Sequence, residues 1–419
     1  MHEMRESGYE WLGKIPSHWK LERLQWHVTE IKETNKPEKS KQVLSLTNKR
    51  GVIPYEEKGA QGNVAKEDYS QYKLAYPGTI VANSMNILIG SVGRCDYFGC
   101  VSPVYYVFKP NEGENLEFLN YMFQMEQFQK ELRRYANGIL EIRLRVSADG
   151  ILKREMAFPP LEEQRKIVDF LENKFAQVDA LIANVQKQIE KLRDYRLSVV
   201  TEAVTKGLSS ESLKKESGVE WIGEIPISWD TIRVKQLLIE RKERSIDGKE
   251  EPLSMSQKVG LVPTKMLDAI PNPASSFVGA KLAFVNDLVF NKLKAHLGVF
   301  SVSKYDGLVS PDYSVYYSTG KVKLKYLEYL FKTPQCISEF RKRSTGIAVG
   351  LTRLYTDGLF AIECPLPPEE EQTQIVEYLD KKWIEIDKLI SIKESKIERL
   401  ERYKKSLIYE YVTGKKEVM

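Results

Sequence analysis

Side chains able to do covalent or metal chemistry are few in this sequence and widely spaced. No Cys-x-x-Cys pair occurs, which argues against a zinc site and for a reduced setting. The four cysteines are Cys95, Cys100, Cys336 and Cys364. Three of the four histidines, His2, His18 and His27, lie near the N-terminus with no nucleophile or carboxylate constellation nearby. The sequence therefore predicts no metal site and no nucleophilic active site.

Motifs for cofactor-dependent chemistry are also absent from the sequence. It has no GxxxxGK[ST] phosphate loop and no GxGxxG after a predicted strand. The Phe-Pro-Pro at 158–160 and the Leu-Pro-Pro at 366–368 lack the polar first residue of an amino-methyltransferase motif. Pro311-Asp312 is the only Pro-Asp pair, and no nearby carboxylate and lysine complete a nuclease site. Catalysis by this chain alone is not expected.

An internal duplication organises the chain instead. Residues 159–205 align without gaps on residues 367–413, and 20 of the 47 positions are identical. Apolar residues recur at spacings of four and three in both copies, which indicates a long amphipathic helix with a heptad seam. A Pro-Pro pair lies just before each helix, acidic residues follow it at the helix start, and Gly207 and Gly414 are natural stops.

Each predicted helix is too long to bury its seam against its own domain. About 45 residues at 1.5 Å each span roughly 65 Å. The economical partner is the other copy, in either orientation. An antiparallel pair fits a duplicated chain best, because it creates a pseudo-two-fold axis. It would also return residue Thr413 towards Ser7, so the two ends of the chain should lie close together.

A second repeat lies ahead of each globular half. Residues 7–19 recur as residues 217–229, with Trp, Gly, Pro and Trp at the same spacing. We interpret this motif as a turn that fixes aromatic rings onto a domain. Between the motif and the helix, short strand patterns alternate with turns, and helices are expected at 116–135 and 325–343. Each half is thus predicted to be α+β.

The duplication predicts five segments. Two α+β domains are separated by two long helices that form an antiparallel coiled coil. The boundaries are 1–158 for the first domain, 159–207 for the first helix, 208–216 for a linker, 217–366 for the second domain and 367–414 for the second helix. The net charge of +5 is concentrated in the globular domains and absent from the repeated helices. A mildly basic surface is compatible with nucleic acid without proving it.

The paired motifs resemble those of the specificity subunit of type I restriction–modification enzymes, the HsdS family. The resemblance covers residues 7–413, through the repeated xWxGxIPxxW and PPxxEQxxIVxxL signatures. The Gly-x-Val-Ser-Pro element at 99–103 has a related copy, Gly-x-Val-Ser-Pro, at 307–311. Each motif is weak alone, but two copies of each in this order are specific.

The resemblance implies a DNA-binding, non-catalytic subunit of a restriction system. Each globular domain would be a target recognition domain that binds one half of a bipartite, asymmetric site in double-stranded DNA. The helices would act as a spacer and dock two methyltransferase subunits, and two restriction subunits can join that complex. S-adenosylmethionine, ATP and Mg²⁺ would belong to the partner subunits, with no cofactor in this chain.

Candidate DNA-contacting residues are basic and amide side chains on predicted loops, because these groups bind phosphate and base edges. In the first domain they are Asn83, Asn86, Arg94, Arg143 and Arg145. In the second domain they are Lys292, Lys294, His296, Arg341, Lys342, Arg343 and Arg353. Arg145 and Arg353 occupy equivalent places, seven residues after Gly138 and Gly346, so they are expected to hold phosphate or structure rather than to read different bases.

Two other functions remain open at this point. The chain could be a self-contained DNA methyltransferase or endonuclease, or a coiled-coil scaffold that binds only proteins. No apolar run reaches 18 residues, and the N-terminal segment has no apolar core of a signal peptide. We therefore expect a cytoplasmic protein with no membrane contact.

Overall fold

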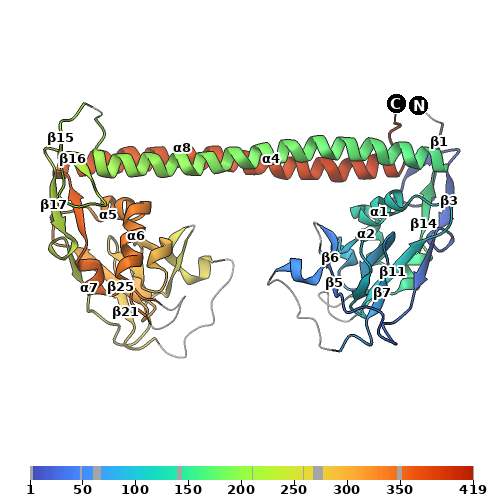
Figure 1. Ribbon diagram of the computed structural model, residues 1–419, viewed down its shortest axis with the longest axis horizontal. Helices are drawn as coiled ribbons and strands as arrows, with labels where there is room; N and C mark the ends of the chain where they lie inside the picture. The colour runs from blue at the N-terminus through green and yellow to red at the C-terminus, as the bar shows by residue number, and fades with distance from the viewer. Residues whose placement is uncertain are drawn as a thin grey trace. The chain divides into compact units, whose positions relative to one another are not determined.

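The computed structural model describes residues 3–47, 50–59, 68–138, 144–209, 211–257, 259–267, 277–346 and 352–418. Its contacts divide the chain into two compact units (Figure 1). Unit 1 comprises residues 1–185 and 394–419, and unit 2 comprises residues 186–393. Each unit therefore combines one globular domain with parts of both long helices.

The core of unit 1 is a four-stranded antiparallel sheet in the order β4-β11-β8-β9. Its strands are β4 (Val28–Ile31), β8 (Thr79–Asn83), β9 (Val92–Cys95) and β11 (Tyr105–Pro110). The central strand β8 is buried at every position, which its short run of small and β-branched residues allows. One face of the sheet packs against helices and the other against a smaller apolar cluster that includes Leu44, Val52 and Val101.

Unit 2 repeats this sheet in the equivalent order β18-β25-β22-β23. Its strands are β18 (Leu238–Glu240), β22 (Leu288–Asn291), β23 (Phe300–Val302) and β25 (Tyr313–Ser318). The register is also repeated, since Asn83 pairs with Tyr105 in unit 1 and Asn291 pairs with Tyr313 in unit 2. The two domains are therefore copies of one framework.

Pairs of short strands complete each domain. In unit 1 they are β1 (Met4–Glu6) with β2 (Lys14–Pro16), β3 (Lys20–Arg23) with β14 (Glu155–Phe158), β5 (Leu44–Thr47) with β6 (Gly51–Pro54), β7 (Lys73–Ala75) with β10 (Gly99–Val101), and β12 (Ala136–Asn137) with β13 (Arg145–Val146). In unit 2 they are β15 (Lys214–Glu216) with β16 (Glu224–Pro226), β17 (Asp230–Arg233) with β26 (Glu363–Leu366), β19 (Leu253–Ser256) with β20 (Gly260–Pro263), and β21 (Lys281–Ala283) with β24 (Gly307–Val309).

The short helices that follow the central sheet in each domain differ from the sequence prediction. The single helices expected at 116–135 and 325–343 are wrong, because each is broken in two. The observed helices are α1 (Leu116–Gln124) and α2 (Glu126–Arg133) in unit 1, and α5 (Leu324–Phe331) and α6 (Pro334–Arg343) in unit 2. Pro334 cannot continue α5, and Thr333 caps α6 by accepting a hydrogen bond from the Cys336 amide. In unit 1 the extended backbone of Met125 makes the break.

Single helical turns fill the remaining connections. They are η1 (Leu24–Trp26), η2 (Tyr55–Lys58), η3 (Ile87–Ile89) and α3 (Ala148–Leu152) in unit 1, and η5 (Val234–Gln236), η6 (Thr264–Met266), η7 (Ala295–Leu297) and α7 (Thr356–Phe360) in unit 2. Most of them pack at equivalent places in the two domains.

The two long helices are α4 (Leu161–Lys206), with 46 residues, and α8 (Glu369–Val412), with 44 residues. Within unit 1 the ring of Phe170 lies 4.5 Å from that of Tyr411, and Lys404 Nζ lies 2.8 Å from Asp179 Oδ1. Residue numbers rise along one helix as they fall along the other, so the pairing is antiparallel. Within unit 2 the same direction follows from Lys393 with Gln188 and Arg196 with Asp387. The predicted antiparallel coiled coil is confirmed in each unit.

The repeated Trp motif anchors the long helices in both units. In unit 1 the buried Trp19 donates its indole N–H to Glu163 of α4 at 3.0 Å. In unit 2 the buried Trp229 donates to Glu371 of α8 at 2.8 Å. The structural interpretation of this motif is therefore correct. It explains why the motif and the start of the helix recur together in the sequence.

The ends of the long helices return to the same motif. Gly414, which follows α8, lies against Pro16 and Trp19 in unit 1, and Gly207, which follows α4, lies against Pro226 and Trp229 in unit 2. Both glycines have positive φ angles, 69° and 79°, which a side chain would strain. Lys415 Nζ also donates to the carbonyl oxygen of Leu12. The predicted proximity of the two chain ends is confirmed within unit 1 (Figure 1).

Candidate nucleic-acid interface

The turn after the central buried strand carries candidate residues in both units. In unit 1 the Asn83 side-chain oxygen accepts the Met85 amide at 3.0 Å, and η3 then ends at Gly90 with a left-handed backbone. In unit 2 the Asn291 oxygen accepts the Leu293 amide at 3.1 Å, and η7 ends at Gly298 in the same way. The amide side chain and the glycine therefore fix the same turn twice.

The segment that carries Arg145 in unit 1, or Arg353 in unit 2, packs directly on this turn. The Val146 amide donates to the Ser84 carbonyl in unit 1, and the Leu354 amide donates to the Lys292 carbonyl in unit 2, both at 3.0 Å. Arg145 pairs with Asn137, and Arg353 forms the matching bridge with Thr345. The predicted equivalence of the two arginines is thus confirmed as an equivalence of position.

The first-domain candidates have different surroundings. Asn83 is buried, with 7% of its surface exposed, and its side chain holds the turn. Asn86 and Arg145 are exposed. Arg94 is exposed as well, and its hydrogen bond to Asp96 at 2.6 Å raises the pKa of its guanidinium group. Arg143 lies outside the described residues. The structure therefore brings Asn86 and Arg145 to one region of the domain and leaves Arg94 on the neighbouring strand.

The second-domain candidates near the turn are more basic. Lys294 is exposed and His296 is partly exposed on η7. The Lys292 ammonium donates to the carbonyl of Pro311 at 3.2 Å. An arginine nitrogen of Arg353 lies 3.4 Å from Asp312 Oδ1. These four residues surround one turn, where unit 1 has two exposed polar candidates.

The last three candidates lie at the end of α6. Arg341 is exposed. Lys342 and Arg343 both form ion pairs with the buried carboxylate of Glu339. Burial alone would raise the pKa of Glu339, but hydrogen bonds from these two cations outweigh it and lower that pKa. Lys342 and Arg343 also line a surface pocket with Trp221. Lys342 and Arg343 therefore lie in a different part of the domain from the η7 turn.

Sequence reasoning missed two apolar side chains on these turns. Ile89 on η3 is 68% exposed and Leu297 on η7 is 49% exposed. Both lie directly before the left-handed glycine, at matching positions beside Asn86 and Lys294. Exposed apolar groups beside polar ones are suited to contact the methyl group of thymine. The signal was present in the sequence as an apolar residue next to a turn glycine in both copies.

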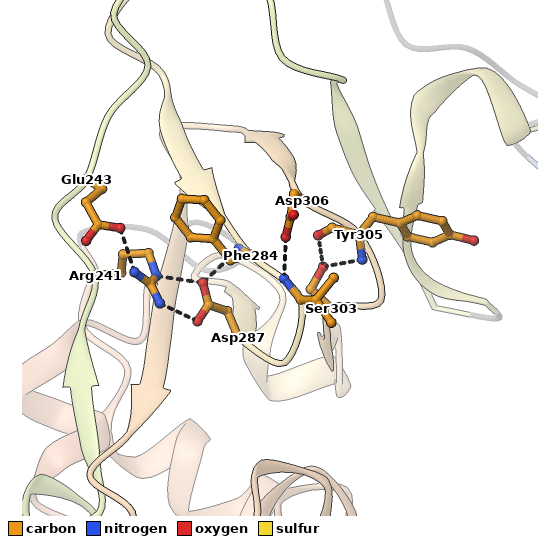
Figure 2. A network of polar contacts seen from close by, with 8 residues as sticks. Arg241, Glu243, Phe284, Asp287, Ser303, Tyr305 and Asp306 are labelled. Atoms are coloured by element: carbon orange, nitrogen blue, oxygen red, sulfur yellow. Dashed lines mark hydrogen bonds and ion pairs between the residues drawn. The ribbon is translucent and has the colours of Figure 1, made fainter.

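A buried ion pair that the sequence did not suggest shapes the second domain. Arg241, just after β18, donates through two nitrogens to Asp287 at 2.6 and 2.9 Å, and a third contact reaches Glu243 at 2.5 Å (Figure 2). Asp287 also accepts the amide of Phe284 at 2.8 Å. The hydrogen bond to Asp287 raises the pKa of the Arg241 guanidinium group. The pair fixes the turn that leads into β22.

In the first domain, different residues occupy the positions of this ion pair. Residue 31, an isoleucine, occupies the place of Arg241, because both pair with the equivalent valine of the sheet. Thr79 occupies the place of Asp287 and donates its hydroxyl to the Tyr76 carbonyl at 2.6 Å. The ion pair in unit 2 and the Thr79 hydrogen bond in unit 1 hold the same turn. The pair of Arg241 and Asp287 therefore stabilises the framework and is not part of the exposed interface.

Among the described residues, no group of three or more His, Cys, Asp and Glu side chains is arranged to hold a metal ion. All four cysteines are buried and free. None of the described helices is both long enough and apolar enough to cross a membrane.

Comparison with known proteins identifies the class of this two-domain fold. A family model described as the type I restriction modification DNA specificity domain matches residues 16–191. A Methanocaldococcus jannaschii protein named as a type I restriction enzyme MjaX specificity subunit is 25% identical over 444 residues, covering 96% of this chain and 95% of that protein. The MjaVIII specificity subunit of the same organism is 26% identical over 279 residues, covering 62% of each chain.

The fold is similar to that of a solved structure. A chain from a solved structure of a type I restriction–modification system superposes with a TM-score of 0.67 at 16% sequence identity. The superposition covers 95% of this chain and 98% of that one. The family model and the two named relatives indicate a protein of the HsdS family, the specificity subunits of type I restriction–modification systems, and the fold is consistent with this. The resemblance inferred from the repeated motifs is therefore confirmed.

Proposed function

We propose that this specificity subunit reads an asymmetric, bipartite site in double-stranded DNA, one half with each globular domain. Residues 1–158 and 217–366 are the two readers. The helices at 159–207 and 367–414 keep the readers at a fixed spacing and dock two methyltransferase subunits, and residues 208–216 link the halves. Two restriction subunits join this complex where the system cleaves DNA.

One observation carries this proposal. The two domains share the order and register of the central sheet and the Trp–Glu anchors, yet the exposed side chains on the turn after the central strand differ. Asn86 in the first domain is matched by Lys294 in the second, and Leu88 is matched by His296. A duplicated framework with divergent exposed side chains is what two readers of different half-sites require.

The proposed contacts divide by exposure and by partner. Asn86, Lys294 and His296, with the apolar Ile89 and Leu297, are the candidates for base edges because they project from the turns. Arg145, Lys292 and Arg353 lie next to these turns and are candidates for phosphate. The remaining proposed contacts, with phosphate or supporting roles, are Asn83, Arg94, Arg143, Arg341, Lys342 and Arg343.

The helices suit the role of a spacer. Half-sites on one face of B-form DNA repeat about every 34–36 Å. A helix of 46 residues reaches about 69 Å at 1.5 Å per residue, and a paired helix holds its length as a flexible linker cannot. In this proposal the chain itself is not catalytic. S-adenosylmethionine, ATP and Mg²⁺ are used by the partner subunits.

Binding-site selection tests the proposal. The purified chain, with its methyltransferase subunits, is mixed with random DNA duplexes, and the bound duplexes are sequenced. We expect two different short motifs separated by a constant gap, and binding that weakens as salt rises. Enrichment of a single continuous motif, or no DNA binding at any salt concentration, would contradict the proposal. Methyl transfer by the chain alone would favour the self-contained enzyme instead.

A further inference from the structure

A surface pocket of about 470 Å³ lies in unit 2, at the repeated Trp motif. The residues that matter here are Val219 and Trp221 of the motif, Glu339, Lys342 and Arg343 of α6, and Glu363 of β26. No residue of the proposed DNA-reading turn on η7 lines it. The pocket therefore needs an explanation of its own.

Unit 1 shows what occupies the matching position. There the ring of Tyr9 stands where unit 2 has Val219, and its hydroxyl donates a hydrogen bond to Glu155 Oε2 at 2.8 Å. This bond is the main reason that the pKa of Tyr9 is raised. Glu155 corresponds to Glu363, because each pairs with an arginine at the same register of the neighbouring strand. The carboxylate is thus retained in unit 2 while the tyrosine is lost.

The backbone around the two positions is the same. The amide of Tyr9 donates to the hydroxyl of Ser7 at 3.1 Å, and the amide of Val219 donates to the hydroxyl of Ser217 at the same distance. Trp11 and Trp221 follow two residues later in both motifs. A side chain at 219 therefore leaves its backbone in the direction that Tyr9 takes, and the shorter valine leaves the space beyond it open.

The charges around the pocket define what fits it. Lys342 and Arg343 both form ion pairs with Glu339, so their charges on the pocket side are already balanced. Glu363 is half-exposed and has Arg233 as its described ion-pair partner, with the contacting atoms 3.3 Å apart. A ligand that combines an aromatic ring with a hydrogen-bond donor would pack on Trp221 and Val219 and donate to Glu363.

We propose that this pocket binds a tyrosine side chain of a partner polypeptide. The ring takes the place that Tyr9 takes in unit 1, and its hydroxyl donates to the carboxylate of Glu363 as Tyr9 donates to Glu155. The first domain supplies this side chain from its own sequence, whereas the second domain takes it from outside. The pocket gives the two domains different protein-binding properties on an otherwise shared framework.

Methyl NMR of the full chain tests the proposal, with labelled valine and alanine methyl groups and N-acetyl-tyrosinamide as the probe. We expect saturable shifts of the methyl resonances of Val219 and of Ala361, which also lines the pocket, with a dissociation constant in the millimolar range, as for a small ligand. N-acetyl-phenylalaninamide, which lacks the hydroxyl group, should bind about tenfold more weakly. No shift at these methyl groups, or equal binding of the two probes, would overturn the proposal.

Three variants and one further probe sharpen the test. Val219→Tyr should fill the pocket and abolish binding with the rest of the spectrum unchanged, and Glu363→Gln should weaken binding about tenfold through loss of the charged acceptor. Tyr9→Val should create a second site, reported by the new valine methyl group. Free tyrosine separates a partner's side chain from a free amino acid. If free tyrosine binds more tightly than the capped probe, the partner polypeptide is the wrong ligand.

Discussion

One buried cluster of the first globular domain, around His27, is polar, whereas the matching cluster of the second domain is apolar. In unit 1 the buried His27 stacks on Phe158, with its Nδ1 atom 2.8 Å from Glu114 and its Nε2 atom 3.3 Å from Glu22. The matching residues in unit 2 are Leu237, Ile232, Val322 and Leu366, which lie in or against the main apolar core. The same backbone framework thus holds a buried polar cluster in one domain and a buried apolar cluster in the other.

At the edge of the central sheet the difference is reversed: the first domain is apolar and the second is polar. There unit 1 is mostly apolar, with Ile31 in the smaller core, and unit 2 has the buried pair of Arg241 and Asp287. Both clusters differ between the units at several residues together, as expected when a buried polar group is costly without partners. The comparison teaches that the backbone and the Trp–Glu anchors define this fold, while the buried polar clusters are particular to each domain.

The largest expected effect comes from breaking the ion pair of the second domain. Asp287→Ala removes the buried carboxylate that accepts two hydrogen bonds from Arg241 and leaves the largely buried guanidinium group with only the exposed Glu243, so it should lower the free energy of unfolding of unit 2 by about 3–5 kcal/mol. Thr79→Ala at the matching place in unit 1 should cost about 1 kcal/mol, the worth of one neutral hydrogen bond. Hydrogen exchange by mass spectrometry resolves the two units. Similar losses of unfolding free energy in the two variants would show that the ion pair contributes no more than the neutral hydrogen bond.

The base clusters provide a reciprocal test. Leu237→His places an imidazole in an apolar core with no partner and should destabilise unit 2 by about 2–3 kcal/mol. His27→Leu removes one charged hydrogen bond from Glu114 and should destabilise unit 1 by about 1–2 kcal/mol. Adding Glu114→Val and Glu22→Ile to His27→Leu should recover most of that loss. Denaturant unfolding measures each step, and no recovery in the triple variant would refute the exchange of whole clusters.

The Trp–Glu anchors should behave alike in the two units. Glu163→Ala and Glu371→Ala each remove the acceptor of a buried indole N–H, at 3.0 and 2.8 Å. Each should cost about 1–2 kcal/mol. Urea denaturation followed by hydrogen exchange compares them directly. A difference above about 1 kcal/mol, well beyond the usual error of such comparisons, would mean that the anchor is not equivalent in the two copies.

Acid should affect the second domain at a site that the first domain lacks. Glu328 is buried, and although burial raises its pKa, Lys332 and Lys325 outweigh this and lower it below 4.5. A carboxyl with a lowered folded-state pKa stabilises the fold above its unfolded pKa, and this contribution is lost as pH falls through the folded value. The matching residue in unit 1 is Asn120, which does not titrate.

The measurement is the unfolding free energy of unit 2 between about pH 6 and pH 3, where carboxyl groups titrate. The wild type should lose stability more steeply at the acid end than Glu328→Gln does. Unit 1 of the same molecules is the internal control and should be unchanged by the substitution. Identical acid profiles for the two proteins would show that Glu328 makes no contribution.

The sequence predicted the repeated parts of this molecule well, because repetition reveals which residues hold a framework. The long helices, their antiparallel pairing and the role of Trp19 and Trp229 all followed from duplicated spacing. The breaks at Met125 and Thr333 were missed, since an apolar helical pattern continues across both. The pair of Arg241 and Asp287 was also missed. Its members are 46 residues apart in the sequence, and the first domain has no copy to signal them.

The candidate interface was predicted in part. The places of Asn86, Lys294 and the arginines after Gly138 and Gly346 followed from matching turns. Which side chains project from those turns did not follow, because Asn83 and Asn86 look alike in a sequence. Only the fold shows that Asn83 is buried and holds the turn, while Ile89 and Leu297 are exposed beside it.

Exchange of a whole domain tests the central proposal most directly. A chain in which residues 217–366 are replaced by a second copy of residues 7–158 keeps both helices and both Trp–Glu anchors. Its preferred DNA site is determined by selection with the methyltransferase subunits present. Two readers that act separately on an antiparallel spacer predict an inverted repeat of the first half-site with an unchanged gap. A site that remains asymmetric would contradict the account.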